Sequence, residues 1–143
     1  LVGSEMCIRD SNIASNYLGI QGRASNSDMS GVIAISNAIP TMRALVSVNL
    51  LNNDVGTKQA DNLATILKEH ATLKSLCGNK GDETELDMSG KKMGADGAIM
   101  LAPEIVTNGA LNSLGLSLNN IGPEGAKHVA EAIKGHVSAL RFD

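Results

Sequence analysis

The chain has almost no aromatic residues, which limits what can fill its interior. Its 143 residues contain no Trp, one Tyr and one Phe. The hydrophobic fraction is nevertheless 43%, close to that of an ordinary globular domain. Leu, Ile, Val, Met and Ala must therefore form the core. Pro is scarce at 3 residues whereas Gly is abundant at 15, which predicts short regular elements joined by many tight turns.

Other absences exclude whole classes of function. The net charge is −3 and no basic stripe could neutralise phosphates, so nucleic acid is not an expected partner. No apolar run approaches the roughly 18 residues that span a bilayer, so we expect no membrane insertion. Cys7 and Cys77 form neither a disulfide framework nor a zinc-ligand spacing. The N-glycosylation pattern Asn-x-Ser/Thr is also absent. These features favour a reducing, cytoplasmic setting.

The first residues do not look like part of the domain. They lack the extended apolar region of a signal peptide. Glu5 to Asp10, which read EMCIRD, resemble the translation of a transposase adaptor used in sequencing libraries. We therefore interpret residues 1–11 as a non-native, adaptor-derived segment and assign the domain to residues 12–143. The chain is then expected to be a fragment of a longer protein.

One phrase recurs along the chain: an apolar residue, two others, Asn, one residue, an apolar residue and Gly. The copies begin at Ile13, Leu50, Met88 and Leu116. The Asn side chain can bond the backbone of a tight turn, and the Gly permits a positive φ. Stacked copies would form an Asn ladder. The structural turn residues are therefore expected to be Asn16, Gly19, Asn53, Gly56, Gly94, Asn119 and Gly122.

A strand pattern precedes the phrase and a helix pattern follows it. Upstream of the second and fourth copies, apolar residues alternate as L-x-x-L-x-L, which predicts strands. Downstream, apolar or small residues fall at i, i+3, i+4 and i+7, which predicts one buried helix face. The four sets begin with Val32, Ala60, Ala98 and Ala126. We expect the small Ala126 and Ala130 to let the last helix lie close to the sheet.

This strand, turn and helix unit of about 28 residues resembles the leucine-rich repeat of the ribonuclease-inhibitor-like subfamily. Intracellular immune receptors and the Ran GTPase-activating protein carry such repeats. The resemblance covers Ile13 to the C-terminus and is most specific over Leu111–Ile133. It implies an α/β solenoid, a segment of a horseshoe, with a parallel sheet on the concave face and helices on the convex face. We expect about four repeats, four helices and four or five strands, within a longer array.

The pattern is interrupted in several places. Insertions are expected near residues 20–30 and 77–84. Before the second, Leu73–Leu76 either forms an extra short strand or only packs beneath the loop. Lys91 replaces an Asn and should interrupt the ladder, and Pro103 should kink its helix or leave a carbonyl unpaired. A last strand has two possible phases, Val137-x-x-Leu140-x-Phe142 or one that uses Ala139 and Phe142.

No catalytic, cofactor or metal site emerges from the sequence. No phosphate-binding loop is present. His128 lies near Glu124 and Glu131, but these residues are better interpreted as a solvated helix surface. The acidic run 82–87 lacks the spacing of a calcium loop. Cys77 has no nucleophile motif around it, and we expect it to be a semi-buried structural residue. We therefore do not expect an enzyme.

The resemblance implies that the concave strand face binds a protein partner of unknown identity. The positions carried over to this face are Val46, Asn49, Leu51, Glu85, Asp87, Ser89, Asn112, Ser117 and Leu118. Glu85 and Asp87 alternate on one face and suit a basic partner. The face lacks Trp, Tyr and Arg anchors, which predicts modest affinity. A protein-interaction scaffold is the first hypothesis. The alternatives are a regulatory GTPase-activator-like domain, a sensor domain of a larger intracellular receptor, or a spacer for a site elsewhere.

Overall fold

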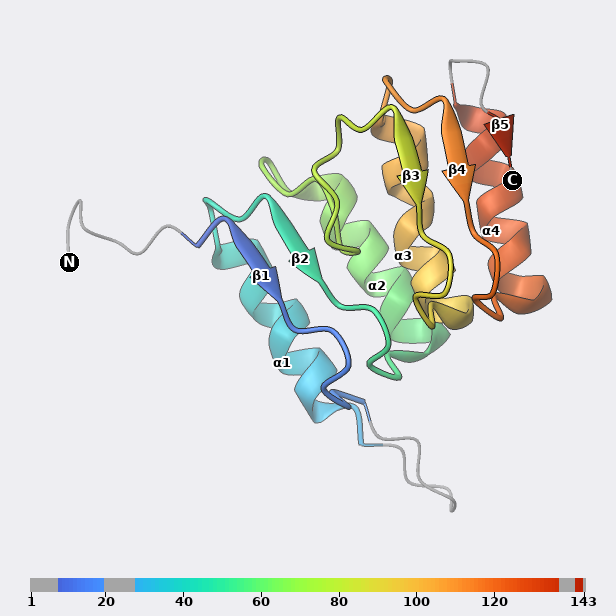
Figure 1. Cartoon of the computed structure of the whole chain (residues 1–143). Coiled ribbons are helices and arrows are strands. Elements are labelled where there is room, and N and C mark those ends of the chain that lie inside the picture. Colours follow the sequence, from blue (N-terminus) through green and yellow to red (C-terminus); the bar gives the residue numbers. More distant parts are fainter. Residues whose placement is uncertain (1–7, 20–27, 137–140, 143) are drawn as a thin grey trace.

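The computed structural model describes residues 8–19, 28–136 and 141–142 (Figure 1). It is a mixed α/β structure in which short strands alternate with helices. The strands are β1 (Asp10–Asn12), β2 (Ser47–Asn49), β3 (Glu85–Asp87), β4 (Ser113–Gly115) and β5 (Arg141–Phe142). The helices are α1 (Ser30–Ala38), a 3-10 turn (Ile39–Thr41), α2 (Gly56–Glu69), α3 (Gly94–Thr107) and α4 (Gly122–Gly135). The four α-helices and five strands of these residues agree with the expected numbers.

All the strand pairs are parallel. β1 pairs with β2, and β4 lies between β3 and β5 in a second sheet. A parallel pair requires a crossover connection, and the α-helices supply it. Figure 1 shows the strands side by side in one layer and the helices behind them in another. One face of the strands is thus left open.

The core lies between the strand layer and the helix layer. The strands β2, β3 and β4 bury their central side chains, Val48, Leu86 and Leu114, at 3%, 8% and 0% exposure. From the helices, Leu63, Leu101 and other members of the expected faces meet these side chains in one apolar cluster. None of the helices among the described residues is long and apolar enough to cross a bilayer.

The strand β1 begins at Asp10, within residues 1–11, which the sequence led us to interpret as an adaptor-derived segment. Asp10 and Ser11 pair with Ser47 and Val48 of β2. The backbone N–H groups of Val46 and Ser47 both donate to the carbonyl of Arg9, at 2.8 and 3.0 Å. Residues 1–7 lie outside the described residues, as do 20–27, which make up most of the first expected insertion.

The second insertion carries a strand-like segment without a helix of its own. Ser75 bridges Ser47 of β2 in parallel, and the N–H of Val48 donates to the carbonyl of Ser75 at 3.0 Å. Leu76 is fully buried beneath it. Leu73–Leu76 therefore pairs with β2 through an isolated bridge, without forming a further strand of its own. The chain then turns at Gly78, where φ is +85°, and enters β3 directly.

Helix α4 departs from the expected face. Ala126 and Ala130 are exposed, whereas Gly125, Val129 and Ala132 are buried. A Cβ added to Gly125 would lie 3.0 Å from the Cβ of Ala98, so α4 packs closely on α3 through this glycine. The expectation that Ala126 and Ala130 lie against the sheet is therefore wrong. In the described part of the chain no helix follows α4, and this side of it stays open.

The remaining irregular features have clear outcomes. Helix α3 continues through Pro103 to Thr107. Strand β5 aligns Phe142 with Leu114 of β4. This register agrees with the phase that uses Ala139 and Phe142 and not with the phase that places Leu140 opposite Leu114. Residues 137–140 themselves lie outside the described residues.

Candidate functional site

The turn after β2 is organised by one buried asparagine. Asn53 is 1% exposed. Its Nδ2 donates to the carbonyls of Ile13 and Leu50 at 2.9 and 3.1 Å, and its Oδ1 accepts the N–H of Asn16. One amide side chain therefore joins its own turn to the turn after β1.

Asn119 has the same role after β4. It is 3% exposed. Its Nδ2 donates to the carbonyls of Met88 and Leu116 at 2.7 and 3.0 Å. Its Oδ1 accepts the N–H groups of Lys91 and Met93 at 2.9 and 3.3 Å. All the donors and acceptors of this buried amide are thus used between two neighbouring turns, as a buried polar group requires.

The ladder of asparagines is not continuous. Asn16 is exposed, and its Nδ2 bonds only within its own turn, to the carbonyls of Ile13 and Ala14. Lys91 takes part through its backbone N–H and not through an amide side chain. The expected interruption at Lys91 therefore separates the pair Asn16–Asn53 from Asn119.

Three of the four turn glycines have the left-handed backbone for which glycine is favoured. The φ angles of Gly56, Gly94 and Gly122 are +78°, +66° and +66°. Gly19 does not have a positive φ, so that expectation is wrong for this position. A Cβ on Gly19 would instead collide with the carbonyl oxygen of Asp54. Close approach of two turns, and not local conformation, explains this glycine.

Gly122→Val tests the conformational requirement alone, because a Cβ at Gly122 would meet nothing within 4 Å. We expect the free energy of unfolding to fall by more than about 1 kcal/mol, since a β-branched residue is strained at positive φ. Urea unfolding measures the loss. Gly109→Val is the matched control, because a Cβ there also meets nothing within 4 Å and φ is not left-handed. Equal losses in both variants would contradict this explanation.

Each turn also contains two left-handed residues before its glycine, a feature that the sequence analysis missed. In chain order they are Ser15 and Tyr17, Asn52 and Asp54, Gly90 and Lys92, and Leu118 and Asn120. Four of the eight positions hold Asn, Asp or Gly, which tolerate this conformation best, and this bias two and four residues before the last glycine was the available signal. Leu118, with a φ of +58°, is the bulky apolar exception in the last turn.

Eight of the nine carried-over positions are exposed or partly exposed, and five of them, Asn49, Glu85, Asp87, Ser89 and Ser117, line hollows over the strands. Glu85, Asp87, Asn112, Ser117 and Leu118 are exposed. Val46, Asn49 and Ser89 are partly exposed. We call these eight residues the exposed strand face. Leu118 is 87% exposed, more than any other large hydrophobic residue of the described chain.

Leu51 was expected on this face but belongs to the core. It is 3% exposed, and its Cδ2 lies 3.1 Å from the place where a Cβ on Gly97 would be. Strand alternation ends with β2 at Asn49, so the alternation rule no longer applies two residues later. The side chain turns toward the beginning of α3. At the equivalent positions of the next two turns stand Ser89 and Ser117, and this difference in residue type was the signal.

The C-terminal half of the exposed strand face forms a shallow negative hollow. Its volume is about 240 Å³, and its lining includes Glu85, Asp87, Ser89 and Ser117. The hydroxyl and the N–H of Ser89 lower the pKa of Asp87, and the charge of Lys91 adds to this effect. The hydroxyl of Ser117 donates to that of Ser89 at 3.0 Å. Neighbouring strands thus present an ionised carboxylate beside a row of hydroxyl groups.

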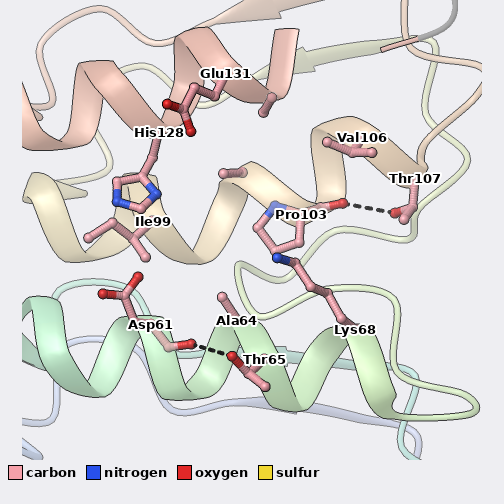
Figure 2. Close-up of a pocket in the computed structure, with 12 residues that line it drawn as sticks. Asp61, Ala64, Thr65, Lys68, Ile99, Pro103, Val106, Thr107, His128 and Glu131 are labelled. Atoms are coloured by element: carbon pink, nitrogen blue, oxygen red, sulfur yellow. Dashed lines mark hydrogen bonds between the residues drawn. The ribbon is translucent and has the colours of Figure 1, made fainter. Parts of the chain in front are cut away.

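A second concavity lies on the helix side, above α3 and between α2 and α4 (Figure 2). It measures about 480 Å³. Small and apolar residues such as Ala64, Ile99 and Ala102 contribute to its lining, and the titratable residues Asp61, Lys68, His128 and Glu131 also line it. His128 pairs with Glu124 at 3.4 Å. Among the described residues no three His, Cys, Asp or Glu side chains are grouped as metal ligands.

Comparison with known proteins adds no assignment for this site. No protein-family model and no curated protein matches the sequence. Any function must therefore be argued from the residues and their geometry.

Proposed function

We propose that the chain is a segment of a leucine-rich-repeat solenoid and that it binds a partner protein through its exposed strand face. The recurring unit supports the proposal, because each of β2, β3 and β4 leads through a left-handed turn to a helix on the same side. An open parallel strand face with no helix over it provides a broad surface. Apart from Val46, its residues are polar, charged or, at Leu118, strained, whereas the buried Val48, Leu86 and Leu114 of the same strands are apolar.

Leu118 is the observation that carries the proposal. A leucine in the left-handed conformation costs roughly 1–2 kcal/mol, and exposure to water gives no return for this cost within the chain. The equivalent positions hold Ser15, Asn52 and Gly90, and of these Asn52 and Gly90 adopt this backbone more readily than a leucine does. Strained residues persist where they serve binding or catalysis. An exposed leucine at the rim of the face is suited to enter an apolar pocket of a partner.

The surroundings of Leu118 specify the chemistry of that partner. The negative hollow with Glu85 and Asp87 lies on the same strands. A partner that offers an apolar pocket beside Lys or Arg side chains would satisfy both features. The contact would combine one buried apolar anchor with charged groups around it, which is the usual arrangement of a protein interface.

Leu118→Asn tests two effects of Leu118 separately: the strain that it adds to the folded chain and its contribution to partner binding. We expect the free energy of unfolding to rise by about 1 kcal/mol, because Asn tolerates the left-handed conformation. We expect capture of partner proteins from a cell extract on the immobilised chain to fall at least tenfold, since an apolar anchor is lost. Urea unfolding and quantitative mass spectrometry of the captured proteins measure the two effects.

Val106→Asn is the matched control, because Val106 is also an exposed apolar residue, at 43%, but it lines the groove on the helix side. Binding at the exposed strand face is supported if some proteins are captured by the unsubstituted chain and by Val106→Asn but not by Leu118→Asn. Equal capture by all three chains would contradict it. An unchanged urea midpoint in Leu118→Asn would contradict the strain.

A further inference from the structure

Glu104 is a buried carboxyl group on the side of α3 that faces the second insertion. It is 3% exposed. Its Oε1 accepts the Nδ2–H of Asn79 at 3.1 Å, whereas its Oε2 is buried and has no hydrogen-bond partner among the described residues. A carboxylate with an unsatisfied oxygen in such a place is costly, because water that would solvate it is excluded. A neutral carboxyl group avoids most of this cost.

The insertion is tied together internally, and it also meets β2, where Cys77 bridges Asn49. The Oγ of Ser75 accepts the N–H groups of Cys77 and Asn79 at 3.0 and 2.9 Å. The carboxylate of Glu83 accepts the N–H groups of Lys80 and Gly81, both at 2.8 Å. Asn79 donates the hydrogen bond from this loop to Oε1 of Glu104 in α3. At the other end, the Nδ2 of Asn108 donates to the carbonyl of Glu83 at 3.1 Å.

No opposite charge compensates Glu104 in the described part of the chain, where it forms no ion pair. Its titratable neighbour is Cys77, and burial, with the charge of Glu104 as a smaller cause, raises the pKa of that thiol well above its usual value. Asp96 of α3 also acts on Cys77. The titratable groups that line the nearby surface hollows, from α2, the segment after it, the insertion and α4, are Asp61, Lys68, His70, Lys74, Lys80, Asp82, His128 and Glu131.

We propose that Glu104 is a proton-controlled latch that holds residues 77–83 against α3 when its carboxyl group is neutral and releases them when it ionises. On ionisation the proton leaves to water and the carboxylate retains the electron pair. Opening of the loop then admits the water that the orphaned Oε2 requires. Closure is restored when the carboxyl group takes up a proton again.

The working range of the latch lies near neutral pH. Burial raises the pKa of Glu104 to about 7, although the polar groups of Ser75, Asn79, Cys77 and Leu76 beside it oppose the shift. Gly78, Asn79 and Lys80 line a hollow of about 440 Å³ whose opposite wall is formed by β1 and β2. Release of the loop would therefore reshape the N-terminal half of the strand layer. An effect on partner binding rests on the proposed function, but the latch itself does not.

Hydrogen exchange of the Cys77 and Asn79 amides tests the latch directly. If the carboxyl group has a pKa of about 7 when closed and 4.5 when open, the opening equilibrium rises roughly 70-fold from pH 5 to pH 8, after correction for intrinsic exchange. In Glu104→Gln, which mimics the neutral acid, we expect this rise to disappear. Glu83→Gln is the control in the same loop and should keep it. Amides of α4, such as that of Val129, report global unfolding.

The possible outcomes are distinct. A rise confined to the loop and abolished by Glu104→Gln supports the latch. The same rise in Glu104→Gln, or an equal rise at Val129, overturns it. The Cδ chemical shift of Glu104 gives an independent reading in the unsubstituted chain, and a midpoint near the ordinary value of 4.5 would also overturn the proposal. None of these measurements requires a partner, so failure of the proposed function leaves them interpretable.

Discussion

Replacement of Asn119 by Ala is expected to lower the free energy of unfolding by about 3–5 kcal/mol, because it leaves several buried backbone groups without partners. The carbonyls of Met88 and Leu116 lose the Nδ2 donor, and the N–H groups of Lys91 and Met93 lose the Oδ1 acceptor. The cavity left by the amide is small and enclosed, so water would replace these bonds poorly. The lost hydrogen bonds are those that join the turn after β3 to the turn after β4.

Asn16→Ala is the control that shows how much of the expected loss is due to burial of the asparagine side chain. The Asn16 side chain is exposed and bonds only to the carbonyls of Ile13 and Ala14, which water can reach. We expect a loss below about 1 kcal/mol there. Because the chain has no Trp, urea unfolding is best followed by far-ultraviolet circular dichroism. Similar losses in the two variants would mean that Asn119 does not hold the turns together.

The alternation of strands, turns and helices could be predicted because it depends on local patterns. Buried Val48 and Leu114 follow from a period of two, and the faces of α2 and α3 follow from a period of 3.6. The asparagine turns were also readable, since an amide followed by a glycine has few other uses at such spacing. These features depend on the side chain and its immediate neighbours in sequence.

The wrong predictions for Leu51, Ala126 and Gly19 concern partners that are distant in sequence. Leu51 is buried because α3 approaches it, and Ala126 is exposed because no helix covers it in the described chain. Gly19 is required by the carbonyl of Asp54 and not by its own φ. For each position the local pattern was read correctly, but its environment was set by how neighbouring units stack. The hydrophobic period of one element does not show how neighbouring units stack, especially where an insertion changes the spacing between units.

Glu104 illustrates a signal that was present and not used. Counted from the turn glycine, its position matches Ile66 in α2 and Ala132 in α4, both of them apolar. A carboxyl group at a position that other units keep apolar indicates a local polar partner or a strained burial. Here the partner is Asn79 of the insertion that only this unit has. Comparison of equivalent positions, and not the helical period, was the way to find it.

Glu104→Gln is expected to raise the free energy of unfolding at pH 8 by about 3 kcal/mol and to change it little at pH 4. The folded pKa of about 7 lies above the ordinary value of 4.5. Below the ordinary value both states hold the proton, so the group has no effect on stability. Between the two values the unfolded chain loses the proton while the folded chain keeps it, and stability falls with rising pH. Above the folded pKa the loss is complete.

Glu83→Gln should show the opposite sign and is therefore the matched control. Burial acts to raise the pKa of Glu83, but the N–H groups of Lys80 and Gly81 outweigh it, and the pKa is lowered overall. Its ionised form stabilises the fold above its ordinary pKa, and that contribution disappears as the pH falls through the folded pKa. Urea unfolding of the three chains between pH 4 and pH 8 measures both effects. If Glu104→Gln and the unsubstituted chain keep the same difference in stability across this range, Glu104 does not titrate in the folded state near neutral pH, and its burial must be relieved by water that reaches Oε2.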